Sequence, residues 1–408
     1  MNTAGSRQTS IPFAKPSIGE EEIAAVTRVL RNGWLTTGAE TRLFEHEFSD
    51  ALGAPHAIAV NSATAGLHLA LEAAGIGPGD RVIVPTYTFA ATAEVVHHLG
   101  AEVTMVDIDR DTLLLDLQQV ELLLQKDPSI RAVIPVHFAG QTCDMNRLME
   151  AAERHQVFVI EDAAHAFPAT CGDQHVGTLG HATVFSFYAT KTITTGEGGM
   201  VTTADTVMAD RMRVMRLHGI SRDVFDRYRQ AGANWRYEVV APGFKYNMTD
   251  LAAAIGRVQL KKSLDFRNRR AVVVDYYFEH LRGLPLRLPT VRDPRDLHAW
   301  HLFVVQVEKH SPLNRDAIMS LLAEAGIGTS VHFIPLHLHP FWSGTPCGTL
   351  DLTESERAFD AAISLPLFTD MSLQDAECVV SAIKRAVAIA NRSALVPPSP
   401  ANHQRRIA

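Results

Sequence analysis

The 408-residue sequence predicts an α/β fold, with a mostly parallel seven-stranded sheet between helices and a smaller α+β C-terminal domain. Two observations predict this fold. As far as Thr203, short β-rich runs alternate with helical stretches, and most runs are apolar at nearly every position, which is typical of parallel strands covered on both faces. Beyond Thr203, helical patterns follow one another with few strands between them, which indicates the second domain.

The N-terminal half supplies the predicted sheet. Residues 17–20 (SIGE) match a capping box led by Ser17, and an apolar stripe predicts the first helix from Ile23, Val26, Val29 and Leu30. Strands are then expected at 57–61, 82–85, 103–107, 132–136, 157–162, 183–187 and 199–203, with helices from near Thr64 and at 90–98, 116–125 and 144–155. Because too few residues separate the last two strands for a crossover helix, the strand at 199–203 can run antiparallel.

The C-terminal half predicts helices at 206–217, 248–264 and 266–281, strands at 301–307 and 328–332, and two or three further helices. We expect a flexible N-terminus over 1–15, a large domain over 16–265 and a small domain over 266–392. The tail 393–408 is rich in proline and polar residues and is expected to be disordered.

Composition narrows the class of protein. A net charge of −7 and a pI near 6.2 argue against a nucleic-acid-binding protein, although a local basic pocket for a phosphorylated metabolite is compatible with them. The four cysteines are far apart without a CxxC pair, so neither a disulfide scaffold nor a zinc ribbon is expected. The polar start and the absence of a long apolar run predict neither a signal peptide nor a membrane span. A cytoplasmic enzyme is the expectation.

Two residues at predicted strand ends carry the chemistry. Asp162 ends the strand in IEDAAHAF, and Lys191 follows the strand in FSFYATK. In open α/β sheets ligands bind at the carboxyl ends of strands. Taken singly, Asp162 can be a helix cap and Lys191 a solvated loop lysine. Together they match the pairing that pyridoxal phosphate (PLP) requires, a lysine for the aldehyde and an acid for the pyridinium nitrogen.

A phosphate cradle and a ring platform fit the same interpretation. Residues 61–66 (NSATAG) join a strand to a helix, so Ala63 and Thr64 offer backbone N–H groups at a helix N-terminus, where Ser62 adds a hydroxyl. Phe89, in PTYTFAAT, is placed to stack on the pyridine face. Ordinary helix capping and core packing remain open for these residues on sequence alone.

The motifs NSAT, VPTYTFAAT, VDID, PVHFAGQ, IEDAAHAF, FSFYATK, GEGGM, GFKYNMTDLAAAIG and VHFIPLHLHP occur in this order from about residue 16 to 390. This set resembles the DegT/DnrJ-type nucleotide-sugar aminotransferases, which are PLP enzymes of fold type I. The resemblance implies that Lys191 is the Schiff-base lysine, Asp162 the partner of the pyridinium and His165 the neighbour of the phenolic oxygen. It also implies ring stacking by Phe89, backbone phosphate contacts from Ala63 and Thr64, and a hydroxyl contact from Ser186.

The resemblance further implies a substrate and an assembly. Lys245, where many relatives have Asn, reaches the phosphate in the neighbouring subunit's site, which implies a homodimer with shared active sites. Gln141 and His332 border the substrate. The segment GFKYN is similar to the branch that makes UDP-linked 4-amino-4-deoxy-L-arabinose, which favours a ketone at sugar C4 over C3 and, as in the family, glutamate as amino donor.

A basic and aromatic loop offers a further candidate for substrate binding. It contains Arg236 and Tyr237, which we interpret as part of a clamp for the nucleotide diphosphate rather than as a solvated surface.

Other interpretations are weaker. His332, His337 and His339 have no cysteine or acidic partner at ligand spacing, so no metal site is expected. Asp107, Asp109 and Asp111 lack the glycine and glutamate of a calcium loop. A sugar dehydratase of this family would have His at 191, and a PLP-binding regulator would carry a DNA-binding element. An ordinary amino-acid aminotransferase remains open, although no C-terminal-domain arginine for its substrate carboxylate is evident.

Overall fold

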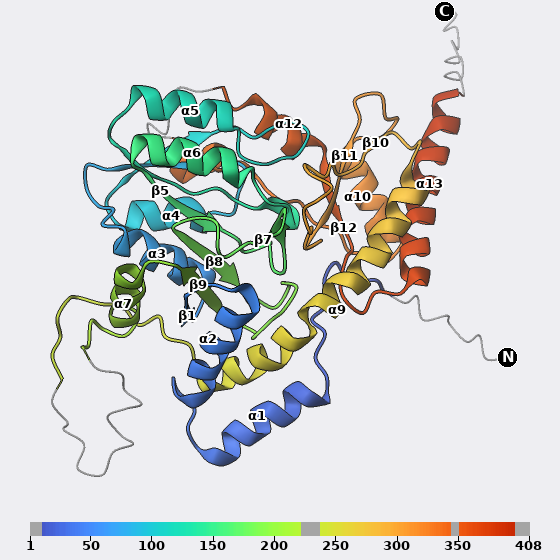
Figure 1. Cartoon of the computed structure of the whole chain (residues 1–408). Helices are drawn as coiled ribbons and strands as arrows, with labels where there is room; N and C mark the ends of the chain where they lie inside the picture. The colour runs from blue at the N-terminus through green and yellow to red at the C-terminus, as the bar shows by residue number, and fades with distance from the viewer. Residues whose placement is uncertain (1–9, 222–236, 344–350, 396–408) are drawn as a thin grey trace, which may run out of the picture.

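The computed structural model describes residues 10–221, 237–343 and 351–395 (Figure 1). Within these ranges the predicted α/β fold is confirmed, with a seven-stranded sheet in the order β1-β9-β8-β5-β4-β2-β3. Its strands are β1 (His56–Val60), β2 (Arg81–Pro85), β3 (Glu102–Val106), β4 (Ile130–Val133), β5 (Phe158–Asp162), β8 (Ala182–Ser186) and β9 (Gly199–Thr203). Within this sheet β9 pairs antiparallel with both β1 and β8, as the short connection before it allowed, and the other pairs are parallel.

Helices cover both faces of this sheet, which is why its strands are apolar throughout. Val82 and Val84 of β2 pack into a cluster with α3 (Ala63–Ala73), α4 (Ala91–His98) and α7 (Thr206–Met215). Ile83, between them, points to the other face and packs with α5 (Leu117–Lys126) and α6 (Met145–His155). The β1 end of that second face is covered by α2 (Ala39–Leu52) and α9 (Asp250–Leu281).

The first helix, α1 (Glu20–Asn32), begins two residues later than the predicted cap would place it. Its N-cap is Gly19 rather than Ser17, and the Glu22 carboxylate accepts the Gly19 N–H at 2.9 Å. The predicted apolar stripe is also partly wrong, since Ile23 and Leu30 are 52% and 55% exposed. The buried face carries Val29 with Glu22 and Ala25, because it is this face that packs on α9.

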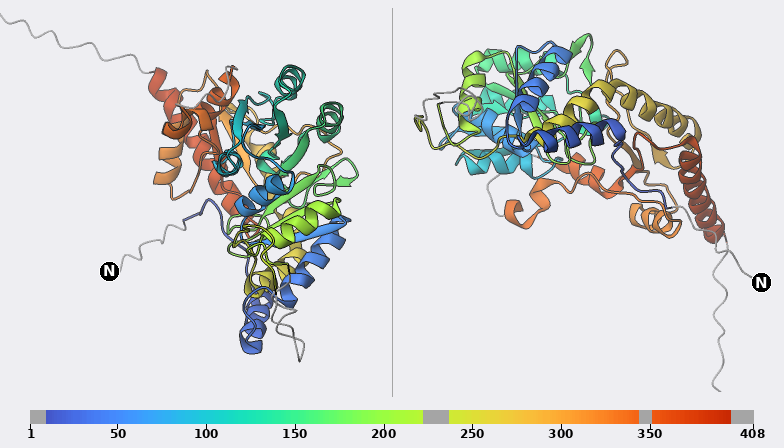
Figure 2. Two further views of the ribbon diagram at one scale, coloured as in Figure 1. Left: turned by 90° about the vertical axis from the view of Figure 1, so that its left-hand side faces the viewer. Right: turned by 90° about the horizontal axis from the view of Figure 1, so that it is seen from below.

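One continuous helix, α9, replaces the two helices predicted over 248–281. Its first half is held by α1 and α2, and α13 (Leu373–Leu395) also packs on it, so α9 joins the large sheet to the C-terminal region (Figures 1 and 2). Gly256 permits the close contact with α2, because a Cβ there would lie 2.6 Å from the ring of Phe44. Tertiary packing on both halves therefore keeps the helix unbroken.

The C-terminal region forms a three-stranded antiparallel sheet in the order β10-β11-β12. The predicted strand at 328–332 is wrong, since only Ser330 forms a bridge, to Ser364 of β12. The sheet consists of β10 (Leu286–Arg287), β11 (Phe303–Val307) and β12 (Ala362–Leu365), and the helices here are α10 (Arg315–Glu324), α11 (Pro340–Ser343), α12 (Thr353–Ala361) and α13. A short hairpin, β6 (Thr170–Cys171) and β7 (Gln174–His175), and the 3-10 turns η1 (Phe138–Gly140) and η2 (Leu336–Leu338) complete the described elements.

The structure describes only parts of the two end segments, residues 10–15 and 393–395. Ile11 is buried and pairs with the C-terminal region, its N–H donating to Gly326 O at 2.9 Å and its carbonyl accepting from the Gly328 N–H at 2.8 Å. At the other end, α13 continues to Leu395, past the predicted start of the disordered tail at 393, and 396–408 lie outside the described residues. Among the described helices none has the length and apolarity needed to span a bilayer.

Candidate active site

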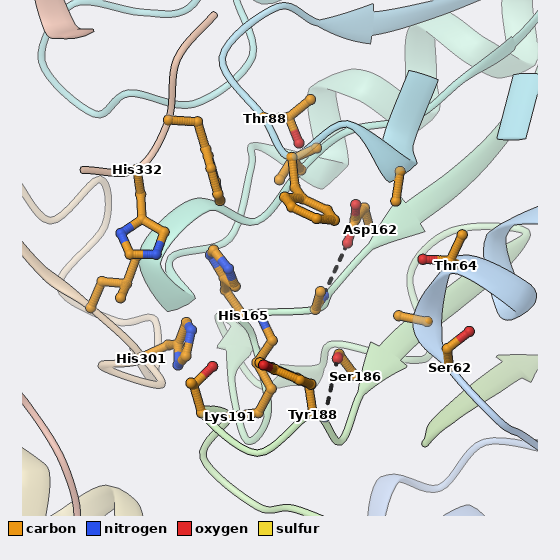
Figure 3. Close-up of a pocket in the computed structure, with 18 of the residues that line it drawn as sticks. Ser62, Thr64, Thr88, Asp162, His165, Ser186, Tyr188, Lys191, His301 and His332 are labelled. Carbon is orange, nitrogen blue, oxygen red and sulfur yellow. Dashed lines mark hydrogen bonds between the residues drawn. The ribbon is translucent and has the colours of Figure 1, made fainter. Parts of the chain in front are cut away.

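A cavity of about 360 Å³ opens at the carboxyl ends of the sheet strands (Figure 3). Strand-end segments after β1, β2, β5 and β8 line it, together with the N-terminal Phe13 and residues of the C-terminal half that include His301, His332 and Phe333. Nine of the predicted site residues meet in it: Ser62, Ala63, Thr64, Phe89, Asp162, His165, Ser186, Lys191 and His332.

Asp162, the last residue of β5, is held by two hydrogen bonds. The Thr92 hydroxyl donates to its Oδ2 at 2.8 Å and the Ala164 N–H to its Oδ1 at 3.1 Å. Burial raises the pKa of this carboxyl above its usual value, and the hydrogen bond from Thr92 opposes the rise. A positively charged ring N–H beside it would restore the carboxylate, so the position suits a cationic partner.

Lys191 enters the same cavity from the turn after β8 and extends between the histidines and Asp162 (Figure 3). Burial lowers the pKa of its amine to about 8, and the charge of Asp162 partly opposes this. More of the amine is therefore unprotonated near neutral pH than in an exposed lysine, which favours its action as a nucleophile or proton carrier.

Hydroxyl groups and a helix N-terminus form the side of the cavity opposite the histidines (Figure 3). Ser62 is the N-cap of α3 and accepts the Ala65 N–H at 3.1 Å, while the N–H groups of Ala63 and Thr64 have no carbonyl of their own helix to bond. Ser186 joins them from the end of β8. Such an N-terminus, ringed by hydroxyls, is suited to a phosphate.

Close packing of β9 supports this cradle. A Cβ at Gly199 would lie 2.8 Å from the carbonyl carbon of Ser62 and 2.9 Å from the Ala63 nitrogen. Only glycine therefore lets β9 lie directly against the turn that begins α3.

Phe89 offers an aromatic face on which a planar ring can stack. Phe89 is 63% exposed although it lines the cavity, and its nearest aromatic neighbour is Phe333 at 6.2 Å between centroids. An exposed face of this kind inside a cavity has room for a planar partner.

His165, His301 and His332 form the opposite wall (Figure 3). The Nδ1 of His165 accepts the Ala139 N–H at 3.3 Å, so the neutral ring carries its proton on Nε2. Burial lowers the pKa of His165 well below its usual value, and Lys191 adds to the effect. His332 places its Nδ1 2.8 Å from Ser364 Oγ, and burial followed by Lys191 lowers its pKa to about 4. The wall is thus neutral at physiological pH.

Three of the described predicted residues, Gln141, Lys245 and Tyr237, do not line this cavity. Gln141 lines a second, small cavity, where its Oε1 accepts the backbone N–H of Arg292 and its Nε2 donates to Thr112 O, and its contact with substrate or cofactor stays a prediction. Lys245 is exposed, and its ammonium donates to Asn247 Oδ1. Tyr237 is 49% exposed, and Arg236 lies outside the described residues.

Sequence reasoning missed several lining or supporting residues. The sequence did indicate Thr92, because it lies one helical turn after Thr88, a residue that follows a predicted strand. In the structure the two hydroxyl oxygens lie 2.9 Å apart, and Thr88 lines the cavity. Tyr188, in FSFYATK, was adjacent to predicted residues. His301 and Phe13 had none, because they come from segments far from the strand ends in sequence.

The motifs set aside as metal sites have structural roles. His337 bonds Thr86 Oγ1 at 2.7 Å and Glu356 at 3.1 Å, away from His332. Asp107 caps α12 by accepting the N–H groups of Glu354 and Ser355, both at 2.8 Å. In the described parts of the chain no group of potential ligands could hold a metal ion.

The residues present fit PLP. An acid for the pyridinium, an amine for the aldehyde, a ring platform and a phosphate cradle line one cavity of suitable size. When bound, the cofactor supplies an electron sink for the substrate carbon that loses its proton. Fold and site together define a PLP-dependent aminotransferase.

The chain belongs to the DegT/DnrJ/EryC1/StrS aminotransferase family, whose model matches residues 16–384. It is 45% identical over 385 residues to the spore coat polysaccharide biosynthesis protein SpsC of Bacillus subtilis, covering 93% of this chain and 98% of the relative.

Solved structures of other proteins have the same fold over most of the chain. A Streptococcus pneumoniae protein assigned as a sugar aminotransferase, solved in its PMP form, superposes with a TM-score of 0.87 at 33% identity, covering 93% and 100% of the two chains. DesV of S. venezuelae gives a TM-score of 0.81 at 34% identity, covering 90% of this chain and 94% of its own.

Proposed function

We propose that this enzyme moves an amino group from L-glutamate to the C4 ketone of a nucleotide-linked sugar. The observation that carries the proposal is the cavity in which Lys191 and Asp162 meet a phosphate cradle. The family match and the polysaccharide role in the name of SpsC support a sugar as acceptor. The segment GFKYN, residues 243–247, supports C4 over C3 by its resemblance to the 4-aminoarabinose branch.

Each residue has a defined task in this proposal. Asp162 accepts the pyridinium N–H and keeps the ring nitrogen protonated. Lys191 carries a proton between the donor Cα and cofactor carbon C4′, and its lowered pKa allows both directions near neutral pH. His165 offers its Nε2–H to the phenolic oxygen, and Phe89 fixes the ring plane. Because one cavity serves both substrates in turn, we expect ping-pong kinetics.

The same proposal includes the assembly and the organisation of the chain. The exposed Lys245 would reach the phosphate in the other subunit of a homodimer, as a point charge. His332 would contact the sugar nucleotide from the cavity wall, and Arg236 and Tyr237 would clamp its diphosphate. We further propose a division into a large PLP-binding domain and a small domain near 265/266, within α9, and a cytoplasmic location.

The test is an absorbance spectrum of the purified enzyme with PLP, before and after L-glutamate. We expect a visible band that glutamate converts to the spectrum of the pyridoxamine form, and that a 4-keto nucleotide sugar then restores. A Lys191→Met variant should bind PLP without this band. A band that no amino acid changes would contradict amino transfer, and recovery only with 3-keto sugars would contradict the position at C4.

A further inference from the structure

Arg270, on α9, is a buried cation with no carboxylate partner among the described residues. Its side chain is 2% exposed, and its Nε has no hydrogen-bond partner there. Its Nη1 makes only two long hydrogen bonds, 3.3 Å to Thr192 Oγ1 and 3.4 Å to the Trp300 carbonyl oxygen. Burial lowers its pKa to about 10. A buried charge without a counterion is costly, so its presence here points to an anion that binds nearby.

The two hydrogen bonds of Arg270 lead to the active site. Thr192 directly follows Lys191, and Trp300 directly precedes His301. Arg270 thus lies behind the cavity wall and joins the segment that carries the reactive amine to the segment that carries an imidazole. It is not itself among the residues that line the cavity.

His301 is the imidazole of this wall with no hydrogen bond at either ring nitrogen within the described chain. It is 5% exposed, its Nδ1 is fully buried without a partner, and its ring centroid lies 4.4 Å from that of His165. Burial lowers its pKa well below the usual value, and neighbours that include Lys191 and Arg270 lower it further. The neutral ring therefore holds one unused N–H donor next to the cavity.

The chemistry of the amino-acid substrate indicates which group this imidazole N–H binds. An amino acid carries its α-carboxylate on the carbon whose proton Lys191 moves, so the carboxylate must lie within one bond of that carbon and therefore close to Lys191. Among the described lining residues there is no arginine, and Lys191 is the one lysine. His165 and His332 already use their Nδ1 atoms, on Ala139 and Ser364, whereas His301 is uncommitted.

We infer that the imidazole N–H of His301 donates to the α-carboxylate of the amino donor, and that Arg270 is a positioning residue whose charge balances this carboxylate from behind the wall. This inference rests on the proposed transfer from an amino acid and extends it to the residues that select the donor. It also explains how a chain with no arginine in the described cavity lining accepts an amino acid.

The test compares two amines that differ only at the α-carboxylate. L-glutamate carries it and γ-aminobutyrate lacks it. For the holoenzyme we would measure the concentration of each that half-converts the visible cofactor band. His301→Phe should raise the value for glutamate about tenfold to hundredfold, the effect of one hydrogen bond to a charged group, and leave that for γ-aminobutyrate unchanged. Arg270→Met should act in the same direction, by about tenfold.

Conservative variants and a non-reacting ligand separate recognition from structure. His301→Gln and Arg270→Lys keep a donor or the charge and should recover part of the glutamate affinity. Calorimetry with α-methyl-L-glutamate, which has the carboxylate but no Cα hydrogen, should show the same losses without turnover. If Arg270→Met does not fold, Arg270→Lys and the His301 variants carry the test.

His68→Gln is the matched control. His68 is also buried, with Nε2 unpartnered in the described structure, but it faces Tyr246 rather than the cavity. Equal losses for both amines, or losses only in the acceptor half-reaction, would overturn the inference. If wild-type enzyme itself responds to no amino acid, the proposed function fails along with it, and this is seen before any variant is compared.

Discussion

At the scale of single residues, burial in the cavity shifts the pKa values of its acid and its amine in opposite directions. Burial raises the pKa of Asp162 and lowers that of Lys191, so in the cofactor-free protein each group is driven toward its neutral form. PLP would relieve both, because its pyridinium compensates the acid and its aldehyde consumes the amine. Without PLP these two groups would therefore destabilise the fold in a way that depends on pH.

Lys191→Met should reveal this cost in the cofactor-free protein. The folded-state pKa, about 8, lies below the ordinary 10.5, so the folded state disfavours the ammonium fully below pH 8, and the penalty fades as pH rises toward 10.5. We expect the variant to melt at a higher temperature than wild type at pH 7 and the difference to shrink by pH 10. The exposed Lys261→Met is the control. A difference independent of pH would contradict the assignment.

Thr92 offers a second test, because it donates to the carboxylate that would hold the pyridinium. Thr92→Val should weaken PLP binding and slow turnover by roughly tenfold or more, since a hydrogen bond to a charged group contributes about 1.5–3 kcal/mol. Equilibrium dialysis and steady-state rates would measure both effects. Thr202→Val removes a comparable buried hydroxyl that donates to Gly177 O at 2.8 Å, and it should lower stability alone.

At the scale of elements, the junction of β9 with the start of α3 shapes the phosphate cradle. Gly199→Ala would force a Cβ into contact with the backbone of Ser62 and Ala63, at 2.8 and 2.9 Å. Since overpacking typically costs about 1–3 kcal/mol, we expect the variant to melt at a lower temperature than wild type and to bind PLP more weakly. Gly77→Ala, with no atom within 4 Å of the added Cβ, should change neither. Unchanged PLP affinity in the Gly199 variant would show that the cradle tolerates the shift.

Elements were predictable where one local pattern decides the structure. The seven sheet strands follow from apolar runs buried on both faces, and Asp162 and Lys191 from their places at strand ends. The single helix α9 was not, because what keeps it continuous is packing against α1, α2 and α13 rather than any local signal.

Prediction of the site residues from sequence has the same limit, because some of them are brought together only by tertiary packing. His301 and Phe13 enter it from distant segments, and no pattern near the strand ends announces them. Gln141 lines a different cavity because its side chain accepts a hydrogen bond from Arg292, a residue remote in sequence about which the family motif gives no information.

At the scale of the whole molecule, the proposed homodimer assigns Lys191 and Lys245 of one active site to different subunits. Lys191 lies in the cavity of its own chain, whereas Lys245 is exposed and its side chain turns to Asn247. A mixed dimer therefore distinguishes a shared site from a self-contained one. Chains with Lys191→Met and chains with Lys245→Ala should each be nearly inactive when alone.

Mixing and refolding the two variants in equal amounts should restore about a quarter of wild-type activity. In a twofold-symmetric dimer half of the random pairs are mixed, and each mixed pair regains one intact site of two. Light scattering should show the dimer, and the activity of mixtures should track the mixed fraction. No recovery would mean that Lys245 serves its own chain or none, because then no combination of these subunits unites both lysines in one site.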